Sequence, residues 1–282
     1  MDLRARPYRS VLYIPGSKER ALEKARAMPI DAIIFDLEDA VAPSEKPAAR
    51  AILAEALTRS YGNRTRIVRI NGFDTEWGKA DAKAAAAMDC DAILLPKVES
   101  TAQLDALAEL TDKPLWAMME TPAGMLAANE IAAHPRLQGM VMGTNDLAKE
   151  LNSRFRADRL PMLSGLGLCV LAAKAHGKVI VDGVYNAFKD DAGLQAECAQ
   201  GRDMGMDGKT LIHPAQVDIA NAAFAPGTEE IDLARRQIDA YEEAEKAGQG
   251  VAVVDGKIVE NLHVETARKT LAKAEAIAAL AD

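Results

Sequence analysis

Eight short apolar runs recur along the chain, each followed by a helix-like segment. Runs rich in Val, Ile and Leu are typical of strands in a parallel sheet that helices cover on its faces. Over 282 residues, this repeated order favours one (β/α)₈ TIM barrel over two small domains. An open doubly wound sheet is the alternative, although no Gly-x-Gly-x-x-Gly fingerprint opens a helix. We expect strands at residues 10–15, 32–39, 66–71, 92–97, 114–120, 137–146, 179–185 and 209–214.

The pattern changes after residue 226. Residues 227–282 contain a charged helix, a short hairpin-like element at 251–256 and a last helix from about 264 to 280. About 55 residues are more than a barrel needs. We therefore predict a catalytic barrel domain at 1–226 and a C-terminal helical extension at 227–282, which forms a lid or an element exchanged with a partner subunit.

Composition restricts the class of function. A formal net charge of −8 argues against general binding to nucleic acid or to membrane surfaces, because polyanions would be repelled. Cys90, Cys169 and Cys198 are far apart and follow no metal or disulfide spacing, so we expect buried thiols in a reducing compartment. No apolar run approaches the roughly 20 residues that span a bilayer, and the N-terminus lacks an apolar signal core. We expect a cytoplasmic protein.

Polar residues follow the apolar runs, and in a barrel of this kind they meet at the carboxyl ends of the strands, where the active site lies. Glu120 and Asp146 end successive runs and supply two carboxylates to one region. Hard divalent cations prefer such oxygen ligands, so Mg²⁺ is the expected ion, and without a Cys/His cluster zinc is not expected. The predicted ring comprises Asp36, Glu38, Asp39, Arg69, Asn71, Lys97, Glu120, Asn145, Asp146, Asp182 and His213.

Each of these residues also has a structural interpretation. A carboxylate at a strand end can cap the next helix, and Asp146 could be only an N-cap. Six acids around one mouth are nevertheless costly without a cation. Arg69 could hold Asp39 or Glu38 in an ion pair while it faces a ligand, and for His213 a structural role is the simpler interpretation. A solvated surface or a phosphate site would explain the basic residues Arg4, Arg6, Arg9, Lys18, Arg20 and Lys24.

Seven segments, taken together, resemble a known family. They are Arg9-Ser-Val-Leu-Tyr-Ile-Pro-Gly, Asp36-Leu-Glu-Asp-Ala-Val, Arg69-Ile-Asn, Leu95-Pro-Lys, Glu120-Thr-Pro, Gly143-Thr-Asn-Asp-Leu and Ile212-His-Pro-Ala-Gln. The chain resembles the citrate lyase β-subunit-like group of the HpcH/HpaI aldolase family, which includes malyl-CoA and citramalyl-CoA lyases. The resemblance covers nearly the whole chain. It implies a Mg²⁺-dependent barrel enzyme, a homotrimer or homohexamer, that acts on a CoA thioester and a small 2-oxoacid.

The resemblance also implies roles for individual residues. Glu120 and Asp146 would ligate Mg²⁺, and Arg69 would stabilise the enolate oxygen of the acyl-CoA. Losing one such oxyanion donor typically costs about 2.7–4 kcal/mol, which ranks Arg69 with the metal ligands. Basic residues near the N-terminus would meet the CoA phosphates. Metal waters and Arg69 would be held by Asp36, Glu38 and Asp39, and the 2-oxoacid carboxylate would be received by Gly143, Thr144, Asn145 and Asp146.

One departure from the family pattern bears on the reaction. The lyases carry a catalytic aspartate, a few residues after a glycine, in a lid from a neighbouring subunit; here Gly256 is followed by Glu260, and Asp255 is the competing carboxylate. If the lid carboxylate lies away from the acyl methyl group, it could instead activate a water molecule that attacks the thioester carbonyl. We take Arg69, Asp39 and Glu260 as the expected catalytic residues.

The expected function is that of a Mg²⁺-dependent lyase on a 3-hydroxyacyl-CoA such as malyl-CoA or citramalyl-CoA. Its products would be glyoxylate or pyruvate together with an acyl-CoA. Three alternatives stay open: a thioesterase that hydrolyses (3S)-malyl-CoA to malate and CoA, a citrate lyase β-subunit acting on an acyl-carrier thioester, and a non-catalytic barrel that binds CoA esters.

Overall fold

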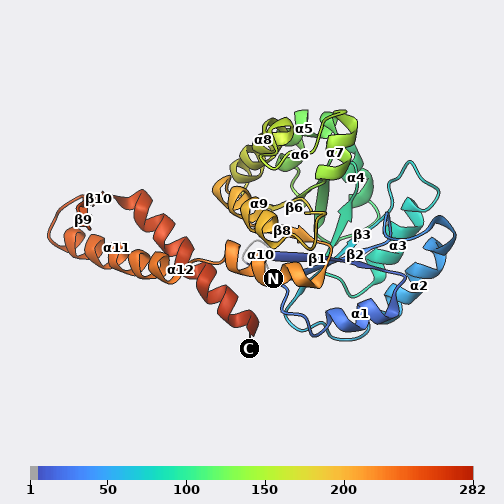
Figure 1. Ribbon diagram of the computed structural model, residues 1–282, viewed down its shortest axis with the longest axis horizontal. Helices are drawn as coiled ribbons and strands as arrows, with labels where there is room; N and C mark the ends of the chain where they lie inside the picture. The colour runs from blue at the N-terminus through green and yellow to red at the C-terminus, as the bar shows by residue number, and fades with distance from the viewer. Residues whose placement is uncertain (1–5, 282) are drawn as a thin grey trace. The chain divides into compact units, whose positions relative to one another are not determined.

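Eight parallel strands close into a barrel in the computed structural model, which describes residues 6–281 (Figure 1). Each strand pairs with the next in sequence and β8 pairs with β1, so the predicted (β/α)₈ barrel is confirmed and the open sheet is excluded. The strands are β1 (Ser10–Pro15), β2 (Ala32–Asp36), β3 (Thr65–Arg69), β4 (Ala92–Leu95), β5 (Leu115–Met119), β6 (Leu137–Met142), β7 (Val179–Asp182) and β8 (Gly208–Leu211).

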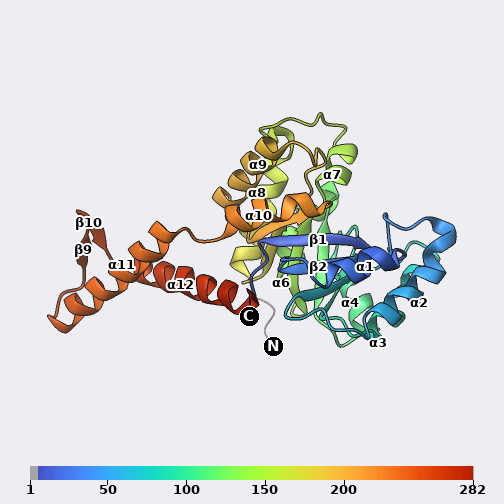
Figure 2. The same cartoon turned by 60° about the horizontal axis from the view of Figure 1, so that its bottom comes forward.

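Helices surround this barrel and cover the outer faces of its strands, as Figures 1 and 2 show from two directions. They are α1 (Glu19–Ala25), α2 (Lys46–Ala56), α3 (Gly78–Ala87), α4 (Thr101–Ala108), α5 (Pro122–Leu126), α6 (Ala128–Ala133), α7 (Thr144–Glu150), α8 (Leu163–Ala175), α9 (Asp191–Asp203) and α10 (Val217–Phe224). Short 3₁₀ turns occupy η2 (Pro43–Glu45), η3 (Leu160–Met162) and η4 (Pro214–Gln216). The main hydrophobic core lies between strands and helices.

A second, smaller core fills the barrel interior. Because strand side chains alternate, every second residue points inward, and these residues are apolar in the lower layers. Trp116 lies here with its ring 5.2 Å from that of Tyr8. Room for the indole comes from Gly139 on β6, where a Cβ would come within 2.5 Å of the Trp116 ring. The pairing of β5 with β6 shifts register at this point.

Three aspartates fasten neighbouring strands where the strands begin. Asp31 accepts the Arg9 N–H at 2.7 Å and pairs with its guanidinium, and Asp91 accepts the Arg66 N–H at 2.8 Å. Asp207 accepts the Ile180 N–H at 2.8 Å. Each carboxylate precedes one strand and satisfies a donor at the start of its neighbour. Arg9, one of the basic residues considered for phosphate binding, is thus engaged in a structural ion pair; Arg4 lies outside the described residues.

Several predicted boundaries were wrong. The run at 137–146 is not one strand: β6 ends at Met142, and residues 144–150 form α7. The sequence at 123–133 predicts one helix, but the segment divides into α5 and α6 at Ala127. Ser17 follows Pro15-Gly16 and is predicted to cap the next helix, but α1 begins after Lys18 and no side-chain cap bond is made. At the end of β6, Gly143 interrupts the strand and precedes the first turn of α7.

Residues 225–281 belong to a separate compact unit. Two long helices, α11 (Thr228–Lys246) and α12 (Asn261–Ala281), pack against each other. An antiparallel hairpin of β9 (Ala252–Val254) and β10 (Lys257–Val259) lies between them in sequence. Ala244, Val259 and Val264 form part of a small core of its own.

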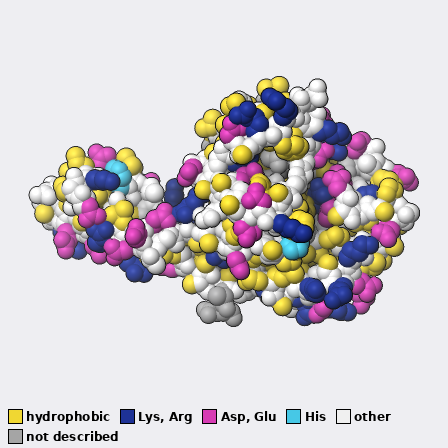
Figure 3. Space-filling model, viewed as in Figure 1, with side chains coloured by type: hydrophobic (Ala, Val, Ile, Leu, Met, Phe, Trp, Pro, Cys, Tyr) yellow, Lys and Arg dark blue, Asp and Glu magenta, His cyan; other side chains and the backbone are white. Residues whose placement is uncertain are grey.

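The surface carries charged side chains of both signs, and the cysteine thiols lie inside the fold. Lysine, arginine, aspartate and glutamate side chains are interspersed over the face seen in Figure 3. In the described part of the chain, no helix combines the length and apolar character needed to cross a membrane. Cys90, Cys169 and Cys198 are free and buried, as predicted.

Substituting Gly139 tests the fit of the barrel interior. A methyl group at Gly139 would collide with the Trp116 ring, so Gly139→Ala should lower the free energy of unfolding by about 1–3 kcal/mol. Denaturant unfolding measures the change. Gly167→Ala is the matched control, because its Cβ meets nothing within 4 Å and should raise helix stability by up to about 1 kcal/mol. Equal stability of Gly139→Ala and the native protein would contradict this account of the core.

Candidate active site

Arg69 lies at the centre of the polar residues in the barrel mouth. The inward alternation of β3 carries its side chain into the barrel, where Nε and Nη2 donate to Asp36 Oδ1 and Oδ2 at 2.8 and 2.6 Å. The N–H groups of Glu38 and Ala40 donate to the same carboxylate at 2.9 and 3.0 Å. Burial by itself would raise the pKa of Asp36, but Arg69 and these N–H groups lower it below the usual value. Asp36 is therefore a fixed anion.

Two more carboxylates approach the same guanidinium. Nη1 of Arg69 lies 2.8 Å from Glu38 Oε2 and 3.5 Å from Asp39 Oδ2. Burial raises the pKa of Glu38 to about 8, although Arg69 opposes the shift. Asp39 is mostly exposed. Arg69 thus forms ion pairs with Glu38 and Asp39, as its structural interpretation predicts, and it also faces the cavity.

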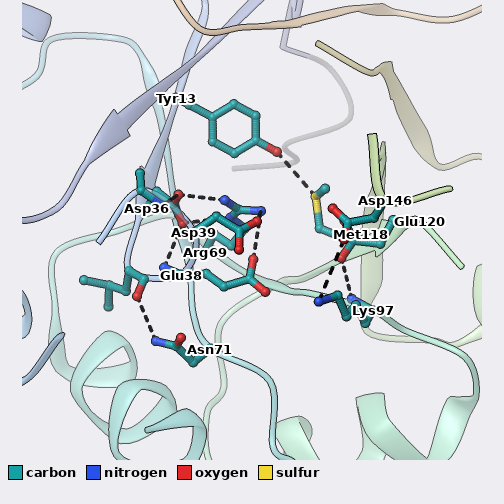
Figure 4. A network of polar contacts seen from close by, with 12 residues as sticks. Tyr13, Asp36, Glu38, Asp39, Arg69, Asn71, Lys97, Met118, Glu120 and Asp146 are labelled. Atoms are coloured by element: carbon teal, nitrogen blue, oxygen red, sulfur yellow. Dashed lines mark hydrogen bonds and ion pairs between the residues drawn. The ribbon is translucent and has the colours of Figure 1, made fainter. Parts of the chain in front are cut away.

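Glu120, Asp146 and Lys97 form a second group on the other side of the mouth (Figure 4). Glu120 Oε1 accepts the Lys97 N–H at 2.8 Å, and Lys97 Nζ lies 4.0 Å from Asp146 Oδ1. Lys97 adopts a left-handed backbone, with φ 48°, which directs this N–H at the carboxylate. Burial raises the pKa of Glu120 to about 7. Gly143 leaves space for Glu120, since a Cβ there would lie 2.4 Å from Oε2.

Asp146 reaches this group from a helix. The prediction that it ends a strand was wrong, because it is the third residue of α7, whose first turn follows Gly143. It is not the N-cap either, since that position belongs to Gly143. A carboxylate in the first turn is favoured by the helix dipole. The position still brings Asp146 to the cavity beside Glu120.

A cavity of about 310 Å³ lies between the two charged groups. Of the predicted ring, it brings together Asp36, Asp39, Arg69, Glu120, Asn145 and Asp146, and the predicted substrate-binding residues Gly143 and Thr144 also line it. Residues that the sequence did not indicate complete the wall: Tyr13, Ala40, Met118, Met142, Val184 and Ile212. Met118 and Met142 alternate with small residues in apolar runs, a pattern that predicts core positions, and here the upper surface of the core forms the cavity wall.

Three residues of the predicted ring have other partners. Asp182 is fully buried between Arg159 at 2.7 Å and Lys209 at 3.3 Å. Asn71 donates to Asp81 and to Leu37 O. His213 stacks on Phe188 and accepts the Ala215 N–H at 3.2 Å, a structural contact. A residue that follows a strand lies near the barrel mouth, but its side chain can still point away from the cavity.

The donor set suits a hard divalent cation. Among residues 6–281, no cluster of three or more Asp, Glu, His or Cys side chains is arranged around a common point. Glu120 and Asp146 provide two carboxylates, one of them buried with a raised pKa, as expected where a cation is to replace a proton. Water and substrate oxygens complete the coordination of Mg²⁺ in sites of this type. The residues therefore fit Mg²⁺ with open positions.

The two candidate lid carboxylates differ in their environment. Asp255 occupies the hairpin turn and pairs with Arg236 at 2.7 Å, an interaction that lowers its pKa. The side chain of Glu260 is exposed and, within the described chain, forms no hydrogen bond or ion pair. Its backbone N–H donates to His263 Nδ1 at 3.0 Å. Of the two, Glu260 has the carboxylate that is available to another molecule.

A closed barrel with charged residues at the carboxyl ends of its strands defines a TIM-barrel enzyme. The sequence matches the family described as HpcH/HpaI aldolase/citrate lyase over residues 9–214, and the C-C bond lyase of the TIM-barrel fold over residues 166–278. The chain belongs to the HpcH/HpaI aldolase/citrate lyase family, which confirms the resemblance.

Relatives of two kinds are similar along the whole chain. A (3S)-malyl-CoA thioesterase of Cereibacter sphaeroides is 72% identical over 281 residues, 99% of each chain. The citrate lyase subunit beta of Escherichia coli is 35% identical, over 96% of this chain and 95% of the other. Among solved structures, CitE of Mycobacterium tuberculosis in complex with magnesium, acetoacetate and coenzyme A has a TM-score of 0.81 and 32% identity, covering 97% of this chain and 100% of that one.

Magnesium binding should depend on pH through Glu120. Its raised pKa means that the metal-free fold retains a proton from about pH 4.5 to about 7, so its stability falls as the pH rises through that range. Mg²⁺ requires the ionised carboxylate, so its apparent Kd should decrease between about pH 6 and pH 8. Calorimetric titration with Mg²⁺ measures this. Glu120→Gln removes one proposed ligand and should raise the apparent Kd at every pH, and a Kd independent of pH in the native protein would refute the assignment.

Proposed function

We propose that this chain is a Mg²⁺-dependent thioesterase that hydrolyses (3S)-malyl-CoA to malate and CoA. The observation that carries the proposal is the 72% identity, over 99% of both chains, to proteins of that name. This favours the hydrolase alternative over the lyase that the sequence led us to expect. The cavity supports the proposal, because it combines a carboxylate pair suited to Mg²⁺ with a fixed arginine.

In this proposal each charged group has one task. Glu120 and Asp146 hold Mg²⁺, which when bound supplies a Lewis acid for substrate oxygens. Arg69, fixed by Asp36, Glu38 and Asp39, stabilises negative charge on the thioester oxygen. Polar groups of Gly143, Thr144 and Asn145 bind the substrate carboxylate at the start of α7.

The C-terminal unit would supply the base. We propose that residues 227–282 act as a lid or as an element exchanged between subunits of a homotrimer or homohexamer, and that Glu260 activates the attacking water. A glutamate can act as a general base once it lies within hydrogen-bond reach of the water. The free thiols Cys90, Cys169 and Cys198 support a reducing compartment, the cytoplasm.

Carbon–carbon cleavage is the second candidate. The match of residues 166–278 to the C-C bond lyase of the TIM-barrel fold favours it. Cleavage of malyl-CoA to glyoxylate and acetyl-CoA would use the same Arg69 on an enolate oxygen and the same metal on the oxoacid. A β-subunit acting on an acyl-carrier thioester is a third candidate, supported only by relatives at 35% identity or less.

The products from (3S)-malyl-CoA distinguish these reactions. Native protein with Mg²⁺ should release free CoA and malate in equal amounts, as measured by thiol titration and chromatography. Acetyl-CoA and glyoxylate as the products would replace the proposal with the lyase. Glu120→Ala should abolish Mg²⁺-dependent turnover while the circular dichroism spectrum stays native, and full activity in this variant would remove the metal assignment.

A pair of amide variants tests the lid carboxylate. Glu260→Gln should lower kcat by roughly 10²- to 10⁴-fold, the usual contribution of a general base. Asp255→Asn is the matched control: asparagine tolerates the left-handed turn, so the only loss is the ion pair with Arg236, and kcat should stay near the native value. Loss of activity in Asp255→Asn with retention in Glu260→Gln would exchange the two roles.

A further inference from the structure

The hydroxyl group of Tyr13 is a polar group of the cavity to which the proposed function assigns no task. Tyr13 lies on β1, and its side chain lines the cavity. The hydroxyl points across the mouth, away from the Asp36 group and toward Met118 (Figure 4). Its one hydrogen-bond partner in the described chain is Met118 Sδ, at 3.4 Å. A thioether is a weak acceptor, so a ligand oxygen would be a better partner.

The position of the hydroxyl is fixed by the ring that carries it. The Arg69 guanidinium carbon lies 5.0 Å from the ring centroid, a cation–π contact. Arg69 is itself fixed by its bidentate pair with Asp36. An O–H donor and a guanidinium thus share one wall, with Glu120 and Asp146 across the cavity. Burial raises the pKa of Tyr13, so the phenol keeps its proton and acts as a donor.

We propose that Tyr13 is a catalytic residue that donates a hydrogen bond to the thioester carbonyl oxygen, as a second oxyanion donor beside Arg69. This inference rests on the proposed function and deepens it. Two fixed donors, one neutral and one charged, stabilise the oxyanion more strongly than they stabilise the neutral carbonyl of the ground state. They need no reorganisation when the charge develops. Met118 and Met142, which line the same cavity, place apolar side chains beside this bond.

The reaction balances without transfer of the Tyr13 proton. The water oxygen forms a bond to the thioester carbon, and the carbonyl π electrons move to the oxygen that Tyr13 and Arg69 hold. When this oxyanion collapses, the carbon–sulfur bond breaks and the electron pair leaves with the CoA sulfur. One proton of the water goes to that sulfur, and the other leaves with ionisation of the new carboxyl group. Tyr13 donates a hydrogen bond throughout.

Tyr13→Phe tests the inference with the loss of a single oxygen. The ring, its packing and the contact with Arg69 remain, so the melting temperature should stay close to native. The kcat for (3S)-malyl-CoA should fall by roughly 10²-fold, and kcat/KM should fall with it, because the bond strengthens in the transition state. Tyr61→Phe is the control: it removes a buried hydroxyl that donates to Leu22 O at 3.3 Å outside the cavity, and kcat should not change.

The pattern of kinetic constants decides the role. A higher KM with unchanged kcat would mean that Tyr13 binds the substrate equally in ground and transition states, and this would overturn the oxyanion assignment. Unchanged constants with a lower melting temperature would show a structural hydroxyl and overturn it as well.

The products formed by the native protein test the proposed function independently of Tyr13. If native protein cleaves the carbon–carbon bond instead of hydrolysing the thioester, the thioesterase proposal falls. The Tyr13 inference is then decided by kcat for cleavage in the same variants, because enolate charge develops on the same oxygen. Native hydrolysis with an equally active Tyr13→Phe variant would overturn the inference alone, and native protein inactive in both reactions would overturn both.

Discussion

The bidentate pairing of Arg69 with Asp36 is the interaction on which the barrel mouth depends. Both groups are buried, so the pair offsets its desolvation only through good geometry and further hydrogen bonds. The N–H groups of Glu38 and Ala40 complete the partners of Asp36. Removing one member of such a pair typically costs about 3–5 kcal/mol, because the other stays charged and buried. The guanidinium is therefore oriented before any substrate binds.

Two buried lysines give the surrounding loops the same rigidity. Lys46 Nζ donates to Leu37 O and Glu38 O at 3.1 and 2.6 Å, which holds the chain just after β2. Lys209 Nζ donates to Gly183 O at 2.6 Å, which holds the chain just after β7. Buried carbonyl groups need a partner, and an ammonium group satisfies several of them at once. The loops that carry cavity residues are thus held from within the helix layer.

Much of the fold and part of the site could be predicted, because both follow the alternation of inward-facing and outward-facing side chains along each strand. Arg69 and Glu120 continue the inward-facing positions of their strands, so their place at the mouth follows from the apolar residues before them. Tyr13 obeys the same rule, but an aromatic residue in an apolar run gives no sign that its hydroxyl matters. Asp146 was misplaced because a glycine turn leads directly into a helix. Arg159 was missed because its partner, 23 residues away in sequence, is defined only by the closed barrel.

The charged residues of the barrel mouth carry more negative than positive charge. Arg69 and Lys97 face five carboxylates, an excess that the fold alone does not neutralise. Burial raises the pKa of Glu38 and of Glu120, so without a cation this region binds protons. In the proposed function the substrate carboxylate is itself an anion, and the ionised ring would repel it. A divalent cation removes most of the excess and reverses the repulsion near Glu120, so in the proposed function we expect Mg²⁺ to bind before the substrate. The five carboxylates are Asp36, Glu38, Asp39, Glu120 and Asp146.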